Sequence, residues 1–259
     1  MRPILRVFLA MQIIAASATA AEWGDLHLRF MYDGEPPEPR TWEADKDVAV
    51  CGKTKLLDES LLVDKESRGI ANVVVMLLKP AEGEVPVHES YEKTAKEPAK
   101  IVSRNCRFEP HVLVMRTTQP LILDNKDLIG HNPKLELFAN PLTSALIPAG
   151  GPFRLDLRNE ESSPVRLECS IHAWMSAYVI VRGNPYAAAS DKQGDVTLKN
   201  VPVGEWNFRI WQERAANLKQ VRQGDKTLDW PKGRVKLTIK PGKNDLGEIR
   251  IPAEAFKLR

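Results

Sequence analysis

Short apolar runs rich in Val, Ile and Leu alternate along the chain with clusters of Gly, Pro, Asn and Asp, and few windows have a sustained helical period. Two runs, R-L-D-L-R and V-R-L-E-C, alternate apolar with polar residues, as strands do when one face is buried. The pattern predicts an all-β protein. Up to residue 181 the expected strands include 25–32, 71–78, 112–115, 121–124, 153–157, 165–169 and 177–181.

Two polar stretches interrupt this pattern. Residues 82–100 are charged and contain two prolines, which indicates a surface loop or a short helix. Residues 212–232 form a second polar insertion, before the strand-like V-K-L-T-I.

The sequence pattern changes after residue 181. A turn at D-K-Q-G precedes an expected strand at 196–198, and a turn at P-V-G precedes a second one at 206–211. Over about thirty residues this segment resembles the small prealbumin-like sandwich of carboxypeptidase regulatory domains. The resemblance implies a second β-sandwich domain over residues 184–259, following a first domain over residues 21–183.

The first twenty residues have the pattern of a secretory signal peptide. Arg2 and Arg6 precede an apolar run over residues 7–16 and the small triplet that ends at Ala20. The run is shorter than the ~20 apolar residues that a spanning helix needs. We expect cleavage after Ala20, a periplasmic or secreted protein, and no membrane span in the mature chain.

Charge is balanced once the predicted signal peptide is removed. Without Arg2 and Arg6, 35 of the 37 basic residues remain against 34 acidic ones, and the two signs are interspersed. This balance gives no electrostatic support for a nucleic-acid partner.

Three cysteines in an exported protein leave one unpaired. Cys51 and Cys106 have polar, turn-like surroundings, so we expect them to form a disulfide and Cys169 to stay free. A different pairing that leaves one inert buried thiol remains open, because sequence does not fix connectivity.

Residues 169–175 read C-S-I-H-A-W-M and follow an expected strand. They bring a thiolate, an imidazole and a thioether into one short loop. Thiolate and thioether suit Cu(I), imidazole serves both oxidation states, and a His2Cys plane with a weak axial Met is typical of electron-transfer copper sites. The motif predicts a mononuclear copper site with Cys169, His172 and Met175 as ligands.

Such a site needs a second histidine. His27 and His88 are expected in solvent, and His111 competes with His131 for the position. His131 is favoured because it follows the strand 121–124 and a turn, 38 residues before Cys169. The predicted metal ligands are His131, Cys169, His172 and Met175.

The motif N-x-D-x-x-x-H-N over residues 125–132, followed by C-x-x-H-x-x-M, resembles the cupredoxins. The resemblance implies a Greek-key β-sandwich, one type 1 copper ion and electron transfer with a redox protein partner. It also implies that Asn132 ties the two ligand loops together, and that an exposed edge of His172, flanked by Ala173 and Trp174, exchanges electrons.

A larger part of the chain, roughly residues 22–213, resembles a bacterial group labelled methylamine utilisation proteins. In that group a cupredoxin-like core is followed by a carboxypeptidase regulatory-like domain. The elements that carry this resemblance are N-C-R-F-E-P-H-V, H-N, C-x-x-H-x-W-M and W-x-E. It implies export and copper binding.

Two other functions remain open. An enzyme with a single copper is disfavoured by Met175, and the absence of H-x-H pairs from the sequence excludes a multicopper oxidase. An extracellular binding module could instead use Cys169 and His172 for a structural zinc ion, although zinc rarely takes a thioether ligand.

Overall fold

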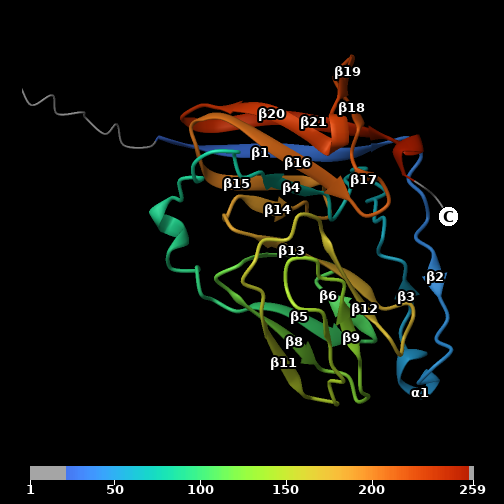
Figure 1. Cartoon of the computed structure of the whole chain (residues 1–259). Coiled ribbons are helices and arrows are strands. Elements are labelled where there is room, and N and C mark those ends of the chain that lie inside the picture. The colour runs from blue at the N-terminus through green and yellow to red at the C-terminus, as the bar shows by residue number, and fades with distance from the viewer. Residues whose placement is uncertain (1–21, 257–259) are drawn as a thin grey trace, which may run out of the picture.

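The computed structural model describes residues 22–256 as an almost entirely β structure (Figure 1), which confirms the predicted class. The predicted signal peptide lies outside the described residues. The strands are β1 (Trp23–Asp33), β2 (Thr41–Trp42), β3 (Leu56–Leu57), β4 (Val74–Leu77), β5 (Ala99–Arg104), β6 (Arg107–Glu109), β7 (Val112–Arg116), β8 (Pro120–Asn125), β9 (Pro133–Leu135), β10 (Thr143–Ser144), β11 (Pro152–Asp156), β12 (Val165–Cys169), β13 (Ser176–Arg182), β14 (Ala187–Ala189), β15 (Asp195–Pro202), β16 (Gly204–Gln212), β17 (Ala216–Asn217), β18 (Gln220–Gln223), β19 (Lys226–Asp229), β20 (Arg234–Ile239) and β21 (Gly242–Pro252). The helical turns are α1 (Val48–Cys51), η1 (Glu89–Tyr91), η2 (Pro231–Gly233) and η3 (Ala253–Ala255).

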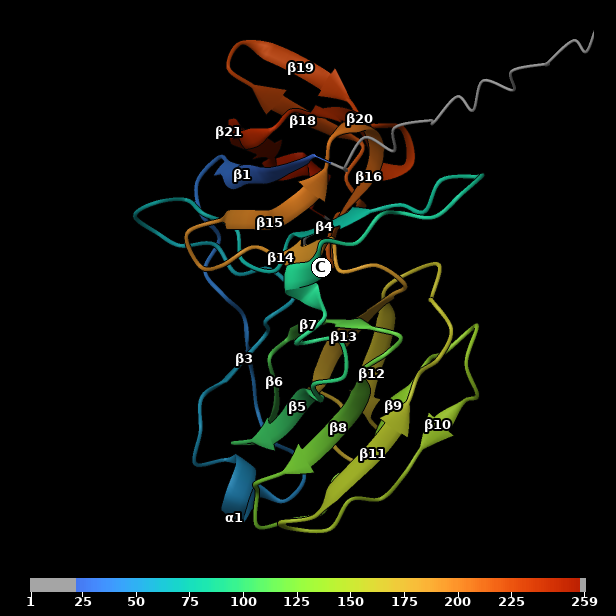
Figure 2. The ribbon, with the colours of Figure 1, turned by 90° about the vertical axis from the view of Figure 1, so that its left-hand side faces the viewer.

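The larger sheets are stacked in two units (Figures 1 and 2). The central unit, residues 99–182, contains the sheets β10-β9-β12-β13-β7 and β11-β8-β5-β6. The terminal unit, residues 22–33, 61–85 and 184–256, contains β15-β1-β21-β18-β19 and β14-β4-β16-β17, with β20 paired to β16. A strap, residues 34–60, carries β2, α1 and β3 along the central unit.

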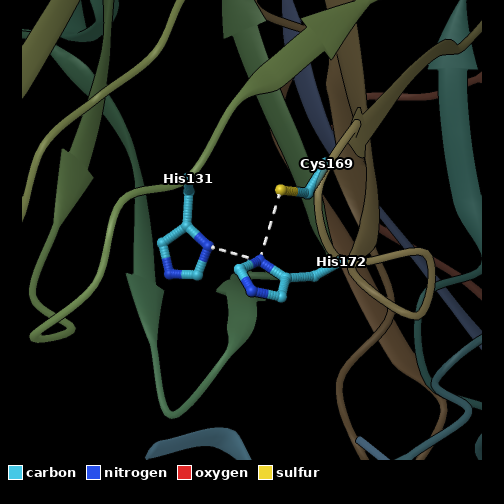
Figure 3. A group of neighbouring side chains, drawn as sticks. All are labelled: His131, Cys169 and His172. Atoms are coloured by element: carbon cyan, nitrogen blue, oxygen red, sulfur yellow. Dashed lines mark hydrogen bonds between the residues drawn. The ribbon is translucent and has the colours of Figure 1, made fainter. Parts of the chain in front are cut away.

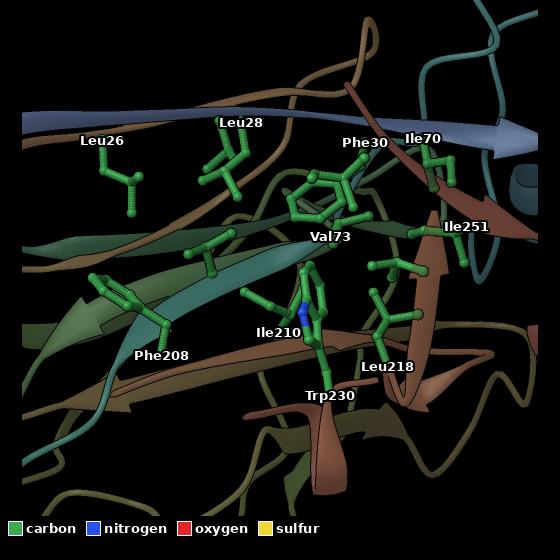
Figure 4. Close-up of a cluster of buried hydrophobic side chains, with 14 of the residues drawn as sticks. Leu26, Leu28, Phe30, Ile70, Val73, Phe208, Ile210, Leu218, Trp230 and Ile251 are labelled. Carbon is green, nitrogen blue, oxygen red and sulfur yellow. The ribbon is translucent and has the colours of Figure 1, made fainter. Parts of the chain in front are cut away.

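Strand β1 completes the terminal unit, and its buried positions alternate strictly. Leu26, Leu28 and Phe30 point into the core between the two terminal sheets, opposite Phe208 and Ile210 (Figure 4). β1 pairs antiparallel with β15 and parallel with β21. The two ends of the chain therefore share one core. A boundary near residue 183, as predicted, would assign β1 to a different domain from β15 and β21, the strands with which it pairs.

Strand β4 joins the two units because both of its faces are buried. Val73, Val75 and Leu77 enter the terminal core, whereas Val74 and Met76 belong to a separate apolar cluster. That cluster also contains Val112 and Ile180 of the central unit and Trp211 of β16. A strand buried on both faces reads as a continuous apolar run, as the sequence V-V-V-M-L does here.

The predicted turn at residues 193–194 places Gly194 directly against β1. The Asp191 carboxylate accepts hydrogen bonds from the backbone N–H groups of Gln193 and Asp195. Gly194 has φ +86°, and a Cβ there would lie 2.1 Å from the carbonyl oxygen of Phe30. Only glycine fits, because both the positive φ and the close backbone approach exclude a side chain.

A disulfide between Cys51 and Cys106 fixes the strap to the central unit, and Cys169 is free and buried. The predicted pairing is thus confirmed. No helix within residues 22–256 has the length and apolar character needed to cross a membrane.

Candidate metal centre

Two loops at one end of the central unit bring the predicted donors together. His131 lies between β8 and β9, Cys169 ends β12, and His172 follows three residues later. β9 and β12 are antiparallel, with Cys169 opposite Pro133. The backbone N–H of Ser170 donates to the carbonyl of Asn132 at 2.9 Å, so pairing of the strands sets the approach of the loops.

The side chains of His131, Cys169 and His172 converge in the interior (Figure 3). The two Nδ1 atoms are 3.1 Å apart, and the Cys169 Sγ lies 3.6 Å from the His172 Nδ1. All three donor atoms lie within 4.8 Å of one another, and both histidines are 0% exposed. Within residues 22–256, this is the one group of three or more His, Cys, Asp or Glu side chains placed closely enough to hold a metal ion together.

A carboxylate holds the outer nitrogen of each imidazole. His131 Nε2 lies 2.8 Å from Asp127 Oδ2, and His172 Nε2 lies 2.9 Å from Asp47 Oδ2. An ionised carboxylate only accepts hydrogen bonds, so each Nε2 carries the hydrogen and a neutral ring keeps its lone pair on Nδ1. Two lone pairs and a sulfur therefore face the same small space, which calls for a proton or a metal cation.

The pKa values of His131 and Cys169 also show that a positive charge is favoured in this space. Burial lowers the pKa of His131, but its hydrogen bonds with Asp127 and Cys169 outweigh burial and raise it to about 9. Burial raises the pKa of Cys169, but the hydrogen bond with His131 and nearby backbone N–H groups lower it to about 6. Without metal, the geometry thus favours a thiolate beside an imidazolium.

Asn132 links the ligand loops, as the family resemblance implies. Its backbone N–H donates to the Cys169 sulfur at 3.4 Å, and its side-chain oxygen accepts from the Ser144 hydroxyl at 2.9 Å. An N–H directed at the sulfur stabilises its anionic form.

Met175 lies in the same loop and is buried in the central core. Its N–H donates to the His172 carbonyl at 2.9 Å, and its carbonyl accepts from the Cys169 N–H at 3.1 Å. These bonds close the loop around the donor residues. They also hold the backbone of Met175 beside His131, Cys169 and His172.

The structure separates His111 from the group. Its Nε2 lies 2.6 Å from the Glu213 carboxylate, in the contact between the two units. The expectation of an exposed His172 edge is wrong, because the ring is fully buried beneath Asp47 and lies 5.1 Å from the Trp174 ring.

Asp47 is the residue that sequence reasoning missed. It precedes His172 by 125 positions and comes from the strap, directly before α1. Asp127 carried a stronger signal, because it is the Asp of N-x-D-x-x-x-H-N, four residues before His131.

No protein-family model matches the sequence, and no curated protein matches it. Several solved structures resemble part of the chain. A Cu-containing nitrite reductase from Thermus scotoductus SA-01 is 14% identical over 41% of this chain, with a TM-score of 0.30. That match spans 25% of the reductase chain.

Smaller proteins give similar values. A reduced Cu(I) form of an amicyanin variant is 14% identical over 33% of this chain and 82% of its own, with a TM-score of 0.30. A purple cupredoxin from Nitrosopumilus maritimus is 18% identical over 32% of this chain and 98% of its own, with a TM-score of 0.28. These TM-scores are too low to assign the chain to a family.

The donor set itself fits a metal ion. One thiolate and two imidazole nitrogens suit copper and zinc, and the carboxylates behind both histidines are the outer partners that metal-bound imidazoles commonly have.

Proposed function

We propose that the chain is an exported electron-transfer protein that binds one copper ion through His131, Cys169, His172 and Met175. The observation that carries the proposal is the convergence of two Nδ1 lone pairs and a low-pKa sulfur, with each outer imidazole nitrogen held by a carboxylate. A redox protein is the expected partner.

Copper is favoured over zinc by the chemistry of the donors, since a thioether in the ligand loop suits Cu(I) and is rarely chosen by zinc. A copper ion held there would supply one-electron transfer between its two oxidation states. The chain's contribution is rigidity. Asp127 and Asp47 hold the rings, and Asn132 holds the sulfur, so the donors need to move little between states.

Electrons would not pass through an exposed His172 edge, because the strap covers it. We propose Trp174 as the alternative route. Its half-buried ring lies beside His172, and its Nε1 donates to the Cys106 carbonyl at 3.1 Å, which fixes the ring near the disulfide.

The test is a titration of the purified, metal-free chain with Cu(II), followed by visible absorption. One equivalent should produce an intense thiolate-to-copper band, which Cys169→Ser should abolish. His131→Gln should weaken or abolish it, whereas His88→Gln, at a histidine bonded to Ser90 outside the group, should leave it unchanged. A colourless copper complex, or one tight zinc ion that copper does not displace, would contradict the proposal.

Voltammetry separates electron transfer from enzymatic use of the same ion. The copper-loaded chain should give a reversible one-electron wave without added substrate, and Met175→Leu should retain copper and raise the reduction potential. An unchanged potential would remove Met175 from the ligand set.

A further inference from the structure

A cavity of about 600 Å³ lies where the strap, the central unit and the terminal unit meet. This volume is within the range of small-molecule sites, ~300–1,000 Å³. The wall combines aromatic with charged side chains. Residues that matter for its chemistry are Trp42, Ser60, Arg107, His111, Trp174 and Arg214.

Buried polar atoms without partners gather in this wall. Within residues 22–256, six buried side-chain nitrogen or oxygen atoms have no hydrogen-bond partner, and four belong to residues that line the cavity. Buried polar groups in native proteins are nearly always satisfied by protein, ordered water or a bound group, so these four atoms are candidates for contacts that the protein itself does not supply. The four atoms are Ser60 Oγ, Arg107 Nε, His111 Nδ1 and Arg214 Nε.

His111 supplies a hydrogen-bond acceptor. Its side chain is 5% exposed, and its Nε2 lies 2.6 Å from the Glu213 carboxylate. The carboxylate accepts, so Nε2 carries the hydrogen, and Nδ1 has no partner within the protein and accepts a hydrogen bond when the ring is neutral. Nδ1 therefore suits a hydroxyl group on a ligand.

Arg214 supplies a cation that is poorly satisfied by the protein. Its side chain is 14% exposed, and its nearest carboxylate oxygen, Asp58 Oδ2, lies 3.7 Å away. That distance exceeds a normal hydrogen bond. A guanidinium presents a planar fork that matches a carboxylate, so Arg214 suits an organic acid.

Charged residues of both signs line the wall. Five basic residues face three acidic ones, and two of the basic ones already have partners outside the lining, since Arg107 lies 2.7 Å from Glu109 and Arg166 lies 3.1 Å from Glu168. The basic residues are Arg40, Arg107, Arg166, Arg214 and Lys219, and the acidic ones are Asp58, Glu59 and Glu213.

We propose that this cavity binds a small aromatic hydroxy acid. Its carboxylate pairs with Arg214, its hydroxyl donates to His111 Nδ1, and its ring lies against Trp42 and Trp174. Indole rings favour flat apolar partners. The proposal depends on the cavity alone and holds whether or not the neighbouring group binds copper.

Calorimetric titration of the purified chain with 4-hydroxybenzoate tests the proposal. One saturable site is expected. Benzoate, which lacks the hydroxyl, and phenol, which lacks the carboxylate, should each bind about 10-fold or more weakly, and the cation tyramine should not bind. No saturable heat with 4-hydroxybenzoate, or equal binding of benzoate and tyramine, would overturn the proposal.

Variants then assign the contacts. Arg214→Met should weaken 4-hydroxybenzoate about 10-fold or more and leave phenol unchanged. Arg222→Met removes an arginine from an ion pair with Asp33, outside the cavity lining, and should change neither. Equal losses in the two variants would overturn the assignment of the carboxylate to Arg214.

His111→Phe should reduce 4-hydroxybenzoate to the affinity of benzoate and leave benzoate itself unchanged. An unaltered preference for the hydroxylated ligand would remove His111 from the site. Thermal unfolding of each variant checks the fold, and the comparison of ligands on the unsubstituted chain needs no variant.

Discussion

The central and terminal units are both layered β structures, but they bury different chemistry. The core of the terminal unit consists mostly of apolar side chains from both ends of the chain (Figure 4), and the polar residues buried in that unit, Asn184, Ser190 and Gln212, have no ionisable side chain. The central unit also buries Asn125, Asp127, His131 and His172. Burying polar groups is unfavourable unless they are bonded, and these four are bonded to one another or to nearby backbone and carboxylate groups.

The contrast indicates a division of labour. Apolar burial in the terminal unit stabilises the fold and brings the chain ends together. Polar burial in the central unit brings the metal-donor side chains together. Without a bound cation this adds little to the stability of the fold, but it forms a metal site in advance of binding. Predictions that damage one unit and spare the other test this division.

The largest expected effect is on the terminal core. Phe30→Ala removes a fully buried ring between the two sheets and should lower the free energy of unfolding by about 3–5 kcal/mol. Phe138→Ala, at a side chain that is 77% exposed in the central unit, should change it by less than about 0.5 kcal/mol. Urea unfolding followed by tryptophan fluorescence measures both, and similar losses would contradict the assigned core.

Removal of the disulfide should act on the central unit and the strap. Cys51→Ser combined with Cys106→Ser should lower the free energy of unfolding by about 2–5 kcal/mol. Hydrogen exchange should increase over residues 41–57, since the strap loses its covalent anchor beside Asp47. Reduction of the unsubstituted chain should reproduce the effect and leave the double variant unchanged. Faster exchange confined to the terminal unit would show that the strap is held by other contacts.

A smaller effect is expected at the carboxylate behind His131. Asp127→Asn keeps the shape of the side chain but removes its charge, and should weaken copper binding about 10- to 100-fold. Asp245→Asn is the matched control, because Asp245 also lies 2.9 Å from a histidine, His27, but in the terminal unit. Competition with a copper chelator gives both affinities. An equal loss in the control would mean that the effect is not specific to the site.

The smallest effect concerns acid stability of the terminal unit. The hydrogen bond from His27 holds the pKa of the Asp245 carboxyl well below its usual value of 3.8, with help from the Gly247 N–H. A lowered folded-state pKa gives stability that is present above pH ~4 and is lost as pH falls through the folded value. Asp245→Asn should therefore lose slightly less stability than the unsubstituted chain between pH 5 and pH 2.

Urea midpoints across that range measure the difference. His27→Gln should flatten the acid dependence in the same way, because it removes the same hydrogen bond. Parallel curves for Asp245→Asn and the unsubstituted chain would contradict the assignment.

Local pattern was sufficient for several strands of both units. Strand β12 begins and ends where V-R-L-E-C predicts, and β8, β11 and β13 differ from their predicted ranges by one residue at each end. The hairpin β18–β19 was missed, because its residues are mostly polar and exposed and carry little alternation. Its backbone pairing, rather than its side chains, makes it a hairpin.

The sequence by itself determined the all-β class, and it favoured the pairing of Cys51 with Cys106 and the choice of His131 beside Cys169 as expected donors without excluding the alternatives. These depend on alternation, composition and short spacing, which are local properties of the chain. Only the tertiary structure decided that β1 joins the last strand, that Asp47 covers His172, and that His111 faces a cavity between units. Each of those contacts joins residues more than 100 positions apart, where the energy of burial and pairing depends on which surfaces meet and leaves no signal in either segment alone.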